Sequence, residues 1–492
     1  MNILLVNPET PHTFWSFHHA VKFIAKKSSE PPLGLITIAA MLPRQWSKKL
    51  IDMNVSDLQD EHILWADYLF LTGMNIQRKS FEDVVTRANR LNTPVVAGGP
   101  MVTTDHNEIP GIDHFILNEA EITLPQWLND LQDGHPEHVY ATGAYPDITQ
   151  TPAPLWHLLE TKKYATISIQ YSRGCPYDCE FCSITMLNGR RPRTKGVEQF
   201  LHELDTLYVN GWRGSVFIVD DNFIGNKRKI KQELLPAIIT WSEKHKHPFS
   251  FATEVSINLA DDTELMRLMA KAGFDHTFVG IESPNSASLQ ECGKAQNLKR
   301  DMLSSVKKMH SSGLRVSGGF IIGFDNDPAD IFEQQIDFIR NSGIVTAMIG
   351  LLNAPTGTRL FQRLKKENRL INKITGDNMD GSINFVPKMN KQKLTDGYKK
   401  VLETIYHPKA YYERVKQFLK DYQPHFSQTE RISWEGIKAL IKSFWILGIF
   451  AKGKRYYWQL FFLSLFRYPQ KFPLAITLAI YGFHFREVVK TV

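Results

Sequence analysis

The sequence has few cysteines, no long hydrophobic run and almost no acidic residue in its last fifty positions. Only four cysteines occur in 492 residues, and three of them fall within eight positions. This distribution excludes a disulfide framework and favours a metal site in a reducing compartment. No run of 18 apolar residues is present, and the N-terminus lacks a basic segment followed by a long apolar one. We therefore expect no transmembrane helix, no signal peptide and a cytoplasmic location.

The net charge of +7 is unevenly distributed. Residues 441–492 contain eight Lys or Arg and one Glu, which accounts for +7, whereas the rest of the chain balances at 50 against 50. The basic character thus belongs to the tail, and we expect no general surface for nucleic acid. The length predicts two or three domains, and 43% hydrophobic with 22% charged residues is typical of a folded globular protein.

Two long stretches alternate short apolar strands with helical segments, as parallel α/β sheets do. In residues 1–135 the expected strands are Ile3–Asn7, Leu50–Asn54, Tyr68–Gly73, Pro94–Ala97 and His114–Leu117. In residues 166–389 they are Ile167–Tyr171, Val216–Asp220, Ser250–Val255, Thr277–Ile281, Val316–Gly323 and Ala347–Leu352. The fold class is therefore α/β, with an N-terminal Rossmann-like domain and a partial (β/α)6 barrel whose site lies at the carboxyl ends of its strands.

The remaining two stretches have a different character. Residues 136–165 lack clear periodicity and include Pro136, Pro146, Pro152 and Pro154, which predicts a linker between the domains. Residues 390–492 look helical and become strongly aromatic and basic, which predicts a separate C-terminal helical domain.

The most informative segment contains Cys175, Cys179 and Cys182 with the spacing CxxxCxxC. Three thiolates so close in sequence can bind three irons of one 4Fe–4S cluster, because cysteine is the usual cluster ligand. The fourth iron would then have no protein ligand. A structural zinc site is the alternative, but such sites usually take four ligands from paired knuckles, and Cys292 is the only other cysteine.

This motif, with Phe181 before its third cysteine, resembles that of the radical S-adenosylmethionine (SAM) superfamily. In that superfamily the open iron binds SAM, and one-electron reduction yields a 5′-deoxyadenosyl radical. The order of the later strand ends continues the resemblance and assigns six residues to SAM: Asp220, Glu254, Glu282, Ser283, Gly319 and Gly323. The first would contact the amino group, the next three the ribose, and the two glycines would support adenine. Singly, an Asp after a strand is often only a helix cap, and a strand Gly can simply relieve packing.

The N-terminal region resembles the cobalamin-binding domain that precedes some radical SAM barrels. The strand-end residues that the resemblance assigns to cobalamin are Thr72, Gly73, Gly98, Gly99 and Glu119. Glycine permits the close backbone approach that the nucleotide tail requires. The DxHxxG loop of many cobalamin proteins is absent, so the cobalt should lack a histidine from that motif. A Rossmann-like domain that binds another ligand, or none, is the alternative.

Together with Ala354–Thr358 and Asp377–Met389, these segments resemble the cobalamin-dependent radical SAM subgroup that includes the hopanoid methylases. The resemblance implies an enzyme that carries a 4Fe–4S cluster, SAM and cobalamin and methylates an unactivated carbon of a small molecule. It also implies a ferredoxin or flavodoxin as electron donor, and it assigns no catalytic residue. A radical cyclisation, rearrangement or oxidation on the same scaffold stays open, as does a cobalamin-binding sensor without enzyme activity. A tRNA methylthiotransferase would need further N-terminal cluster cysteines.

The tail interrupts short aromatic and apolar runs with Lys452, Lys454, Arg455 and Arg467. Two interpretations stay open. The tail is a helical lid packed on the barrel, or it makes peripheral contact with the anionic inner face of a membrane. Membrane contact would favour an apolar or lipid-like substrate, and a chain ending near Ser427 should lose it.

Overall fold

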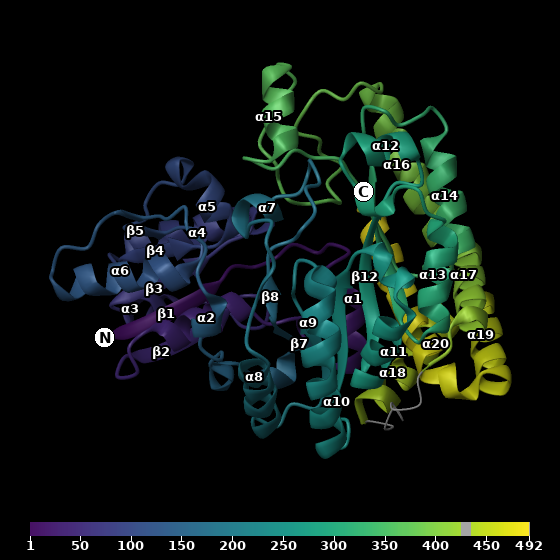
Figure 1. Ribbon diagram of the computed structural model, residues 1–492, viewed down its shortest axis with the longest axis horizontal. Coiled ribbons are helices and arrows are strands. Elements are labelled where there is room, and N and C mark those ends of the chain that lie inside the picture. The colour runs from purple at the N-terminus through teal and green to yellow at the C-terminus, as the bar shows by residue number, and fades with distance from the viewer. Residues whose placement is uncertain (425–433, 492) are drawn as a thin grey trace.

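A computed structural model describes residues 1–424 and 434–491 of the chain. Ser427, the expected end point of a shortened chain, lies outside the described residues. Two six-stranded sheets lie side by side, and a group of C-terminal helices packs beside the second sheet (Figure 1). All strand pairs within the two sheets are parallel.

The N-terminal sheet has helices on both faces. Its strands, in spatial order, are β2 (Ser47–Asp52), β1 (Asn2–Asn7), β3 (Tyr68–Thr72), β4 (Val95–Gly98), β5 (His114–Ile116) and β6 (Val139–Tyr140). One face packs on α3 (Asp60–Leu64), α4 (Arg78–Arg90) and α5 (Pro100–Asp105), and the other on α2 (Leu33–Met41) and α6 (Ala120–Gln132). Covered on both sides, the central strands β1, β3 and β4 are continuous apolar runs, whereas the edge strand β2 is polar in its first half. The strand order reverses between β1 and β3, and sheets of this order bind ligands at that switch point.

The first five strands are the five that the sequence predicts, to within a few residues. The sixth comes from the stretch assigned to the linker. It is tied to the sheet edge by backbone hydrogen bonds from Phe115 to His138 at 2.8 Å and from Leu117 to Tyr140 at 2.9 Å. β6 is only two residues long, and so short a segment shows no hydrophobic periodicity. Its pairing with β5 in the folded chain is what identifies it as a strand.

The second sheet contains six strands in sequence order, as a partial barrel requires. They are β7 (Thr166–Ile169), β10 (Gly214–Ile218), β11 (Phe249–Val255), β12 (Phe274–Glu282), β13 (Arg315–Ile322) and β14 (Ala347–Leu351). The connecting helices are α8 (Val197–Val209), α10 (Leu235–Lys244), α11 (Thr263–Ala272), α13 (Met302–Ser311) and α14 (Ile331–Ser342). On β11 the odd-numbered side chains are buried in the core, whereas Ala252 and Glu254 point to the inner face and are less buried.

Smaller elements surround the carboxyl end of this sheet. They are the hairpin of β8 (Ser172–Arg173) and β9 (Arg193–Thr194), α7 (Ile184–Leu187), α12 (Ser286–Glu291) and α15 (Arg359–Lys366). Short helix α15 stands out beyond the barrel, close to the connection that leads back toward the N-terminal sheet (Figure 1). These elements hold most of the residues of the candidate site.

The C-terminal helices pack on the outer face of the barrel. They are α16 (Lys391–Tyr406), α17 (Pro408–Asp421), α18 (Trp434–Trp445), the π-helical turn η11 (Ile446–Phe450), α19 (Lys454–Arg467) and α20 (Phe472–Val489). Residues 469–489 are long and apolar enough to cross a membrane, but 56% of their most apolar window is buried inside the protein. The Tyr411 hydroxyl donates to the Leu478 carbonyl at 2.6 Å and so ties α20 to α17. By these contacts α20 is a core helix of this fold.

The segment that follows β1 packs on the last helix beside the barrel. The segment after β1 leads to α1 (His18–Val21), which packs on α20. The ring of Phe14 lies 5.6 Å from that of Phe485, and His484 Nε2 is 3.1 Å from the Phe14 carbonyl oxygen. In the same segment, the ring of Trp15 contacts that of Phe278 on the inner face of β12 in a tilted arrangement, with ring centroids 5.0 Å apart. The N-terminal segment therefore lines the barrel as well as linking the domains.

Candidate functional site

The three clustered cysteines lie in the loop that follows β7. Backbone hydrogen bonds from Cys175 to Gly189 at 3.2 Å and from Cys182 to Cys179 at 3.1 Å fold the loop back on itself. Burial raises the pKa of all three thiols, that of Cys182 to about 12, and neighbouring thiols add to the effect at Cys175 and Cys182. Such thiols ionise only when a cation binds them, so this loop fits a metal-centred group rather than free reactive cysteines.

Three of the four cysteines of the chain supply their thiols from this one loop. Within residues 1–424 and 434–491, no three His, Cys, Asp or Glu side chains are arranged to hold one metal ion. Ligands of a single zinc must converge on one centre, whereas a 4Fe–4S cube distributes its thiolates over separate irons. The donor set of three soft thiols on one loop therefore fits a cluster. Cys292 lies beside this loop, since its carbonyl accepts a hydrogen bond from the Glu180 backbone at 2.8 Å, and its thiol donates to the Leu289 carbonyl at 3.5 Å.

Two adjacent aspartates, Asp220 and Asp221, accept hydrogen bonds that stabilise the cysteine loop. Asp220 accepts hydrogen bonds from the Tyr171 backbone at 2.8 Å and the Ser172 hydroxyl at 2.6 Å. Asp221 accepts from the Gly174 backbone at 2.7 Å, one residue before the first cysteine. Burial raises the pKa of Asp220 to about 7, against the hydrogen bonds that favour its charged form. Asp220 is fully buried, and both of its carboxylate oxygens accept hydrogen bonds from the loop. Its contact with SAM stays a prediction.

A buried ion pair lies at the end of β12. Glu282 has a left-handed backbone, with φ 61°, and its carboxylate lies 2.6 Å from Lys294 Nζ. The Asn297 amide donates to the carbonyls of Gly280 and Ile281 at 3.0 and 2.9 Å, which stabilises this strained strand end. Burial opposes the charge on Lys294, but Glu282 and the cysteine thiols outweigh it and raise the lysine pKa. Lys294 thus places a positive charge beside the cysteine loop.

Glu254 is the site carboxylate without a partner. Its side chain is only half-buried and makes no hydrogen bond or ion pair with any residue in the described parts of the chain. Burial, together with the nearby carboxylates of Asp221 and Glu30, raises its pKa to about 8. The structure therefore brings Glu254, Glu282 and Asp221 together on the inner face of the barrel, as protic and anionic groups able to bind hydroxyls.

The other three residues assigned to SAM have local structural partners. Ser283 accepts a hydrogen bond from the Asn285 backbone at 3.2 Å, which shapes the turn into α12. A Cβ on Gly319 would come within 2.7 Å of the Phe278 ring, so this glycine makes room for that ring. Gly323 has φ 113°, and its N–H donates to Asp327 at 2.7 Å at the end of β13. Gly319 lies on the inner face with Glu254, whereas Ser283 and Gly323 are turn residues.

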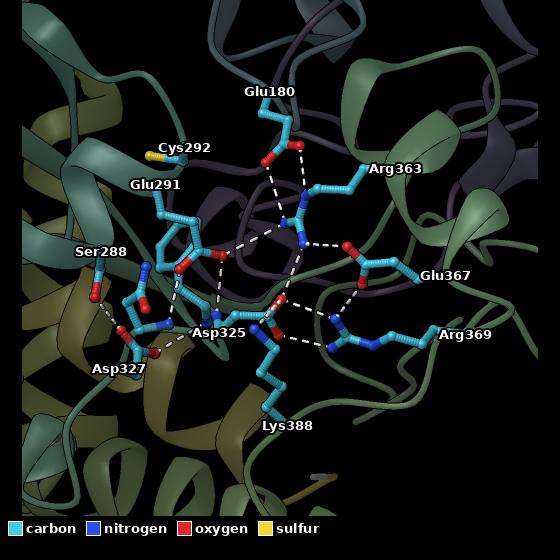
Figure 2. Close-up of polar contacts among 12 residues, drawn as sticks. Glu180, Ser288, Glu291, Cys292, Asp325, Asp327, Arg363, Glu367, Arg369 and Lys388 are labelled. Carbon is cyan, nitrogen blue, oxygen red and sulfur yellow. Dashed lines mark hydrogen bonds and ion pairs between the residues drawn. The ribbon is translucent and has the colours of Figure 1, made fainter.

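A charged network connects the cysteine loop to α15 (Figure 2). Arg363 Nε lies 2.7 Å from Glu180, which stands between the second and third cysteines, and the same guanidinium contacts Asp325 at 2.9 Å. Arg369 also pairs with Asp325, at 2.7 Å. Burial alone would raise the pKa of Asp325, but the hydrogen bonds of Arg369 and Arg363 lower it to about 2. One arginine on α15 thus holds the loop to the end of β13.

The N-terminal sheet presents a nearly bare backbone at its carboxyl edge. Thr72 pairs with Gly98 across β3 and β4, and a Cβ on Gly99 would come within 2.7 Å of the Thr72 hydroxyl oxygen. The Gly99 backbone, with φ 103° and ψ 177°, is a conformation that essentially only glycine adopts. A Cβ on Gly73 would meet Phe81 at 2.8 Å. The structure therefore brings these four residues together, and the absence of side chains on the three glycines fits the close approach of a flat or extended ligand such as cobalamin.

Glu119 joins the two sheets. Its carboxylate lies 2.7 Å from Arg173 and 2.6 Å from Arg193, on the two strands of the hairpin that flanks the cysteine loop. Arg173 also contacts Glu121 at 2.8 Å. Glu119, one of the residues that the resemblance assigns to cobalamin, is thus paired with two arginines. These ion pairs align the edge of the N-terminal sheet with the cysteine loop.

Sequence patterns alone do not find the arginines and the lysine of this site. Arg173, Arg193, Lys294 and Arg363 are separated from their partners along the chain, and single basic residues in loops carry no spacing signal. A weak signal exists only for Arg173, which stands two residues before Cys175 in the motif segment.

A groove among the outer helices is remote from this site. It encloses about 990 Å³ between α13, α14, α16 and α17 and is lined by Arg340, Glu413 and Arg414 among others. Arg414 already donates to the carbonyls of Ile405 at 3.0 Å and Val345 at 3.3 Å. The groove is therefore part of the packing of the outer helices.

Fold and site together define a cobalamin-binding radical SAM protein. The chain matches the models of the radical SAM superfamily over residues 169–339 and of the B12 binding domain over residues 24–128. Residues 358–492 match a domain of unknown function. The cofactors of this class are a 4Fe–4S cluster, SAM and cobalamin.

The sequence relatives define the family more closely. The chain is 39% identical to an uncharacterized methyltransferase of Synechocystis over 100% of its own length and 93% of the relative. It is 35% identical to the hopanoid C-2 methylase of Rhodopseudomonas palustris over 94% of its own length and 89% of that enzyme. The chain therefore belongs to the B12-binding radical SAM family, in the subgroup of hopanoid C-2 methylase, and is an enzyme.

Solved structures support the fold. The radical SAM methyltransferase TsrM of Kitasatospora setae, with cobalamin and a 4Fe–4S cluster bound, matches with TM-score 0.60 and 14% identity, over 76% of this chain and 79% of that one. The cobalamin-dependent enzyme OxsB, with aqua-cobalamin and SAM bound, matches with TM-score 0.62 and 15% identity, over 99% and 80%. The expected order of Rossmann-like domain, partial barrel and helical C-terminus is thus the observed fold.

Proposed function

We propose that this enzyme transfers a methyl group to an unactivated carbon of an apolar, lipid-like small molecule. One observation carries the proposal. The glycine-rich carboxyl edge of the N-terminal sheet faces the cysteine loop at the carboxyl edge of the barrel, and the ion pairs of Glu119 with Arg173 and Arg193 join the two edges. The relationship to a hopanoid C-2 methylase, at 35% identity, supports both methyl transfer and a lipid-like substrate.

The residues have distinct tasks in this proposal. Cys175, Cys179 and Cys182 would hold three irons, with Lys294 balancing the negative charge of the thiolates. Glu254 and Glu282 would bind the hydroxyls of SAM, and the edge of Thr72, Gly73, Gly98 and Gly99 would hold cobalamin. When bound, the cluster and SAM would provide the radical that removes a hydrogen atom from the substrate, and cobalamin would provide the methyl group. Trp15 and Phe278, in contact on the inner face, would offer an apolar surface to such a substrate.

The partners follow from this chemistry. Each turnover needs two single electrons at low potential, which a ferredoxin or flavodoxin would deliver. An apolar substrate partitions into membranes, so we place the enzyme on the cytoplasmic side, in peripheral contact with the inner membrane face.

The decisive experiment measures what is consumed for each methyl group transferred. With methyl-labelled SAM, each methylated product should carry one label and consume two SAM, yielding one 5′-deoxyadenosine, one methionine and one S-adenosylhomocysteine. The C175A/C179A/C182A variant is the control, and it should lose the cluster and all SAM cleavage. Cleavage that persists in this variant would refute the assignment of the cysteines.

One observation favours a second candidate. The chain is 26% identical over 61% of its length to the anaerobic magnesium-protoporphyrin IX monomethyl ester cyclase of Synechocystis. A cyclase or oxidation enzyme on this scaffold would release 5′-deoxyadenosine without labelled product. If turnover with the true substrate gives that result, the second candidate replaces methyl transfer.

A further inference from the structure

The last three helices differ sharply in how far they are buried. On α20, ten side chains are buried, among them Phe485, which packs on Phe14 and Tyr406. On α18 only Ala439 and Ser443 are buried, and on α19 only Tyr457, Leu460 and Ser464. The sequence offered a packed lid and a membrane contact as alternatives for the whole tail. In the structure α20 has the packing of a lid, and α18, η11 and α19 remain to be explained.

These three elements expose large apolar side chains. Half of the exposed large hydrophobic residues in the described parts of the chain come from residues 434–466. Phe450 is 78% exposed, Phe466 and Trp434 are each 77% exposed, and Trp445 is 55% exposed. The others are Ile441, Phe444, Ile449, Phe462 and Leu465. Scattered exposed hydrophobic residues need no explanation, but a concentration of this kind marks a contact surface.

Ring contacts show that the aromatic residues are contiguous. Phe444 on α18 lies 5.0 Å from Trp458 on α19, and Trp458 stacks on Phe462 at 5.7 Å. Phe462 in turn stacks on Phe466 at 6.3 Å, one helical turn further along α19. Trp445 adjoins the row through Phe444, at 6.0 Å. We call this surface of α18, η11 and α19 the aromatic face.

Basic residues accompany the aromatic face, and acidic ones are nearly absent. Residues 434–471 contain one acidic residue, Glu435, which is paired with Lys26 at 3.0 Å. The exposed basic residues of the same elements and their connections are Lys438, Lys442, Lys452, Lys454, Arg455 and Arg467. Such a surface complements an anionic bilayer. The apolar side chains can insert at the boundary of headgroups and acyl chains, and the exposed Lys and Arg side chains are attracted to the anionic headgroups.

The placement of α18 connects this face to the interior of the barrel. α18 packs on the turn Lys22–Ile24, and the Lys442 ammonium donates to the Lys22 carbonyl at 2.7 Å. That turn directly follows α1, a few residues beyond Trp15, which contacts Phe278 on the inner face. A membrane at the aromatic face would therefore lie against the same segment that lines the barrel.

We infer that α18, η11 and α19 dock the enzyme on an anionic bilayer, with the aromatic face inserted at the headgroup level. This inference deepens the proposed function, on which it rests for the lipid-like substrate. The docking is peripheral, because α20, the only helix in the described residues that is long and apolar enough to span, is buried in the core.

The test is sedimentation of the full-length holoenzyme with vesicles of phosphatidylcholine alone or of equal parts phosphatidylcholine and phosphatidylglycerol. The wild type should sediment with the anionic vesicles and be released by salt. W445S/F450S/F466S should lower the apparent affinity by about tenfold or more, because the inserted apolar area is lost. K452Q/K454Q/R455Q should lower it by roughly a hundredfold on anionic vesicles and leave neutral vesicles nearly unaffected.

Matched variants separate docking from general stickiness. L64S/V209S removes exposed apolar side chains on other helices, and K391Q/K393Q/K399Q removes three exposed charges from α16, so both should bind as the wild type does. Point variants are preferred to a chain ending near Ser427, which would also remove α20 and expose the core beneath it.

Three outcomes would overturn the inference. The wild type stays in the supernatant at low salt, or the control variants lose binding equally. Alternatively, sedimentation velocity shows a dimer that W445S/F450S/F466S dissociates, and the face is then an interface between two copies of this chain. Binding of vesicles together with failure to methylate any lipid would leave the docking standing and refute only the proposed substrate.

Discussion

The two carboxyl edges that face each other in this enzyme are built on opposite principles. The N-terminal edge is defined by missing side chains, since Thr72 and three glycines bring the backbones of β3 and β4 close together. The barrel edge is defined by charged side chains, since aspartates, a lysine and an arginine fix the cysteine loop and its surroundings. The comparison suggests that the first edge is sensitive to added atoms and the second to the loss of charge partners.

The largest effect is expected at the glycine-rich edge of the N-terminal sheet. Gly99→Ala should lower cobalamin affinity by on the order of tenfold or more, because its Cβ would meet the Thr72 hydroxyl and strain the backbone. Gly134→Ala is the matched control, since Gly134 also has positive φ, 81°, but a Cβ there meets nothing within 4 Å. Cobalamin binding is followed by absorbance titration and cluster content by iron analysis.

In this test the iron content of Gly99→Ala should equal that of the wild type. Unchanged cobalamin affinity would show that the bare edge does not hold the cofactor, and a loss of iron as well would show that the edges are not independent.

The charged edge can be tested at Arg363. Arg363→Met removes the cation between Glu180 and Asp325 and leaves these carboxylates without it. Because the guanidinium is partly exposed and Arg369 still neutralises Asp325, we expect a loss of about 1 kcal/mol rather than that of a fully buried pair. This corresponds to roughly threefold to tenfold faster loss of iron to a chelator.

Arg340→Met, in an exposed pair with Asp337, is the control and should not change the rate. Cobalamin affinity should stay within about twofold in both variants, as additivity of distant sites predicts. Iron retention unchanged by Arg363→Met would mean that the backbone alone holds the loop.

The smallest expected effect concerns Glu254, the carboxylate without a partner. Its pKa is raised to about 8 in the folded chain, from an ordinary value of 4.5. Between these values the folded chain retains a proton that the unfolded chain has released, so the free energy of unfolding falls as pH rises through this window. Gln has no proton to lose, so Glu254→Gln should gain stability relative to the wild type above pH 8 and not at pH 5.

The effect is measured as the thermal midpoint of the cofactor-free protein at pH 5 and pH 8.5. A shift of a few degrees is expected, since about 1 kcal/mol moves the midpoint of a domain of 150–250 residues by roughly 2–4 °C. Glu198→Gln on the exposed face of α8 is the control. Parallel pH profiles for wild type and Glu254→Gln would indicate that Glu254 is ionised throughout.

The sequence by itself determined the features that depend on near neighbours along the chain. The strands are short apolar runs, and a parallel sheet buries such runs on both faces, so their positions follow from composition and spacing. The three cysteines fall within eight residues, so the loop that holds them can be recognised without the rest of the fold.

The tertiary structure alone decided the contacts between residues far apart in sequence. Glu119 and Arg173 are 54 residues apart and Glu180 and Arg363 are 183 apart, and no local pattern relates such positions. The hydrogen bonds from Tyr171 and Ser172 to Asp220 likewise join residues 48 or 49 positions apart, and no local pattern indicates them. In the tail, α19 and α20 are both rich in aromatic and aliphatic residues, and only packing against the N-terminal segment and the outer helices buries one of them. Whether an apolar helix is buried depends on the elements that pack around it, so the sequence of the helix alone does not predict its burial.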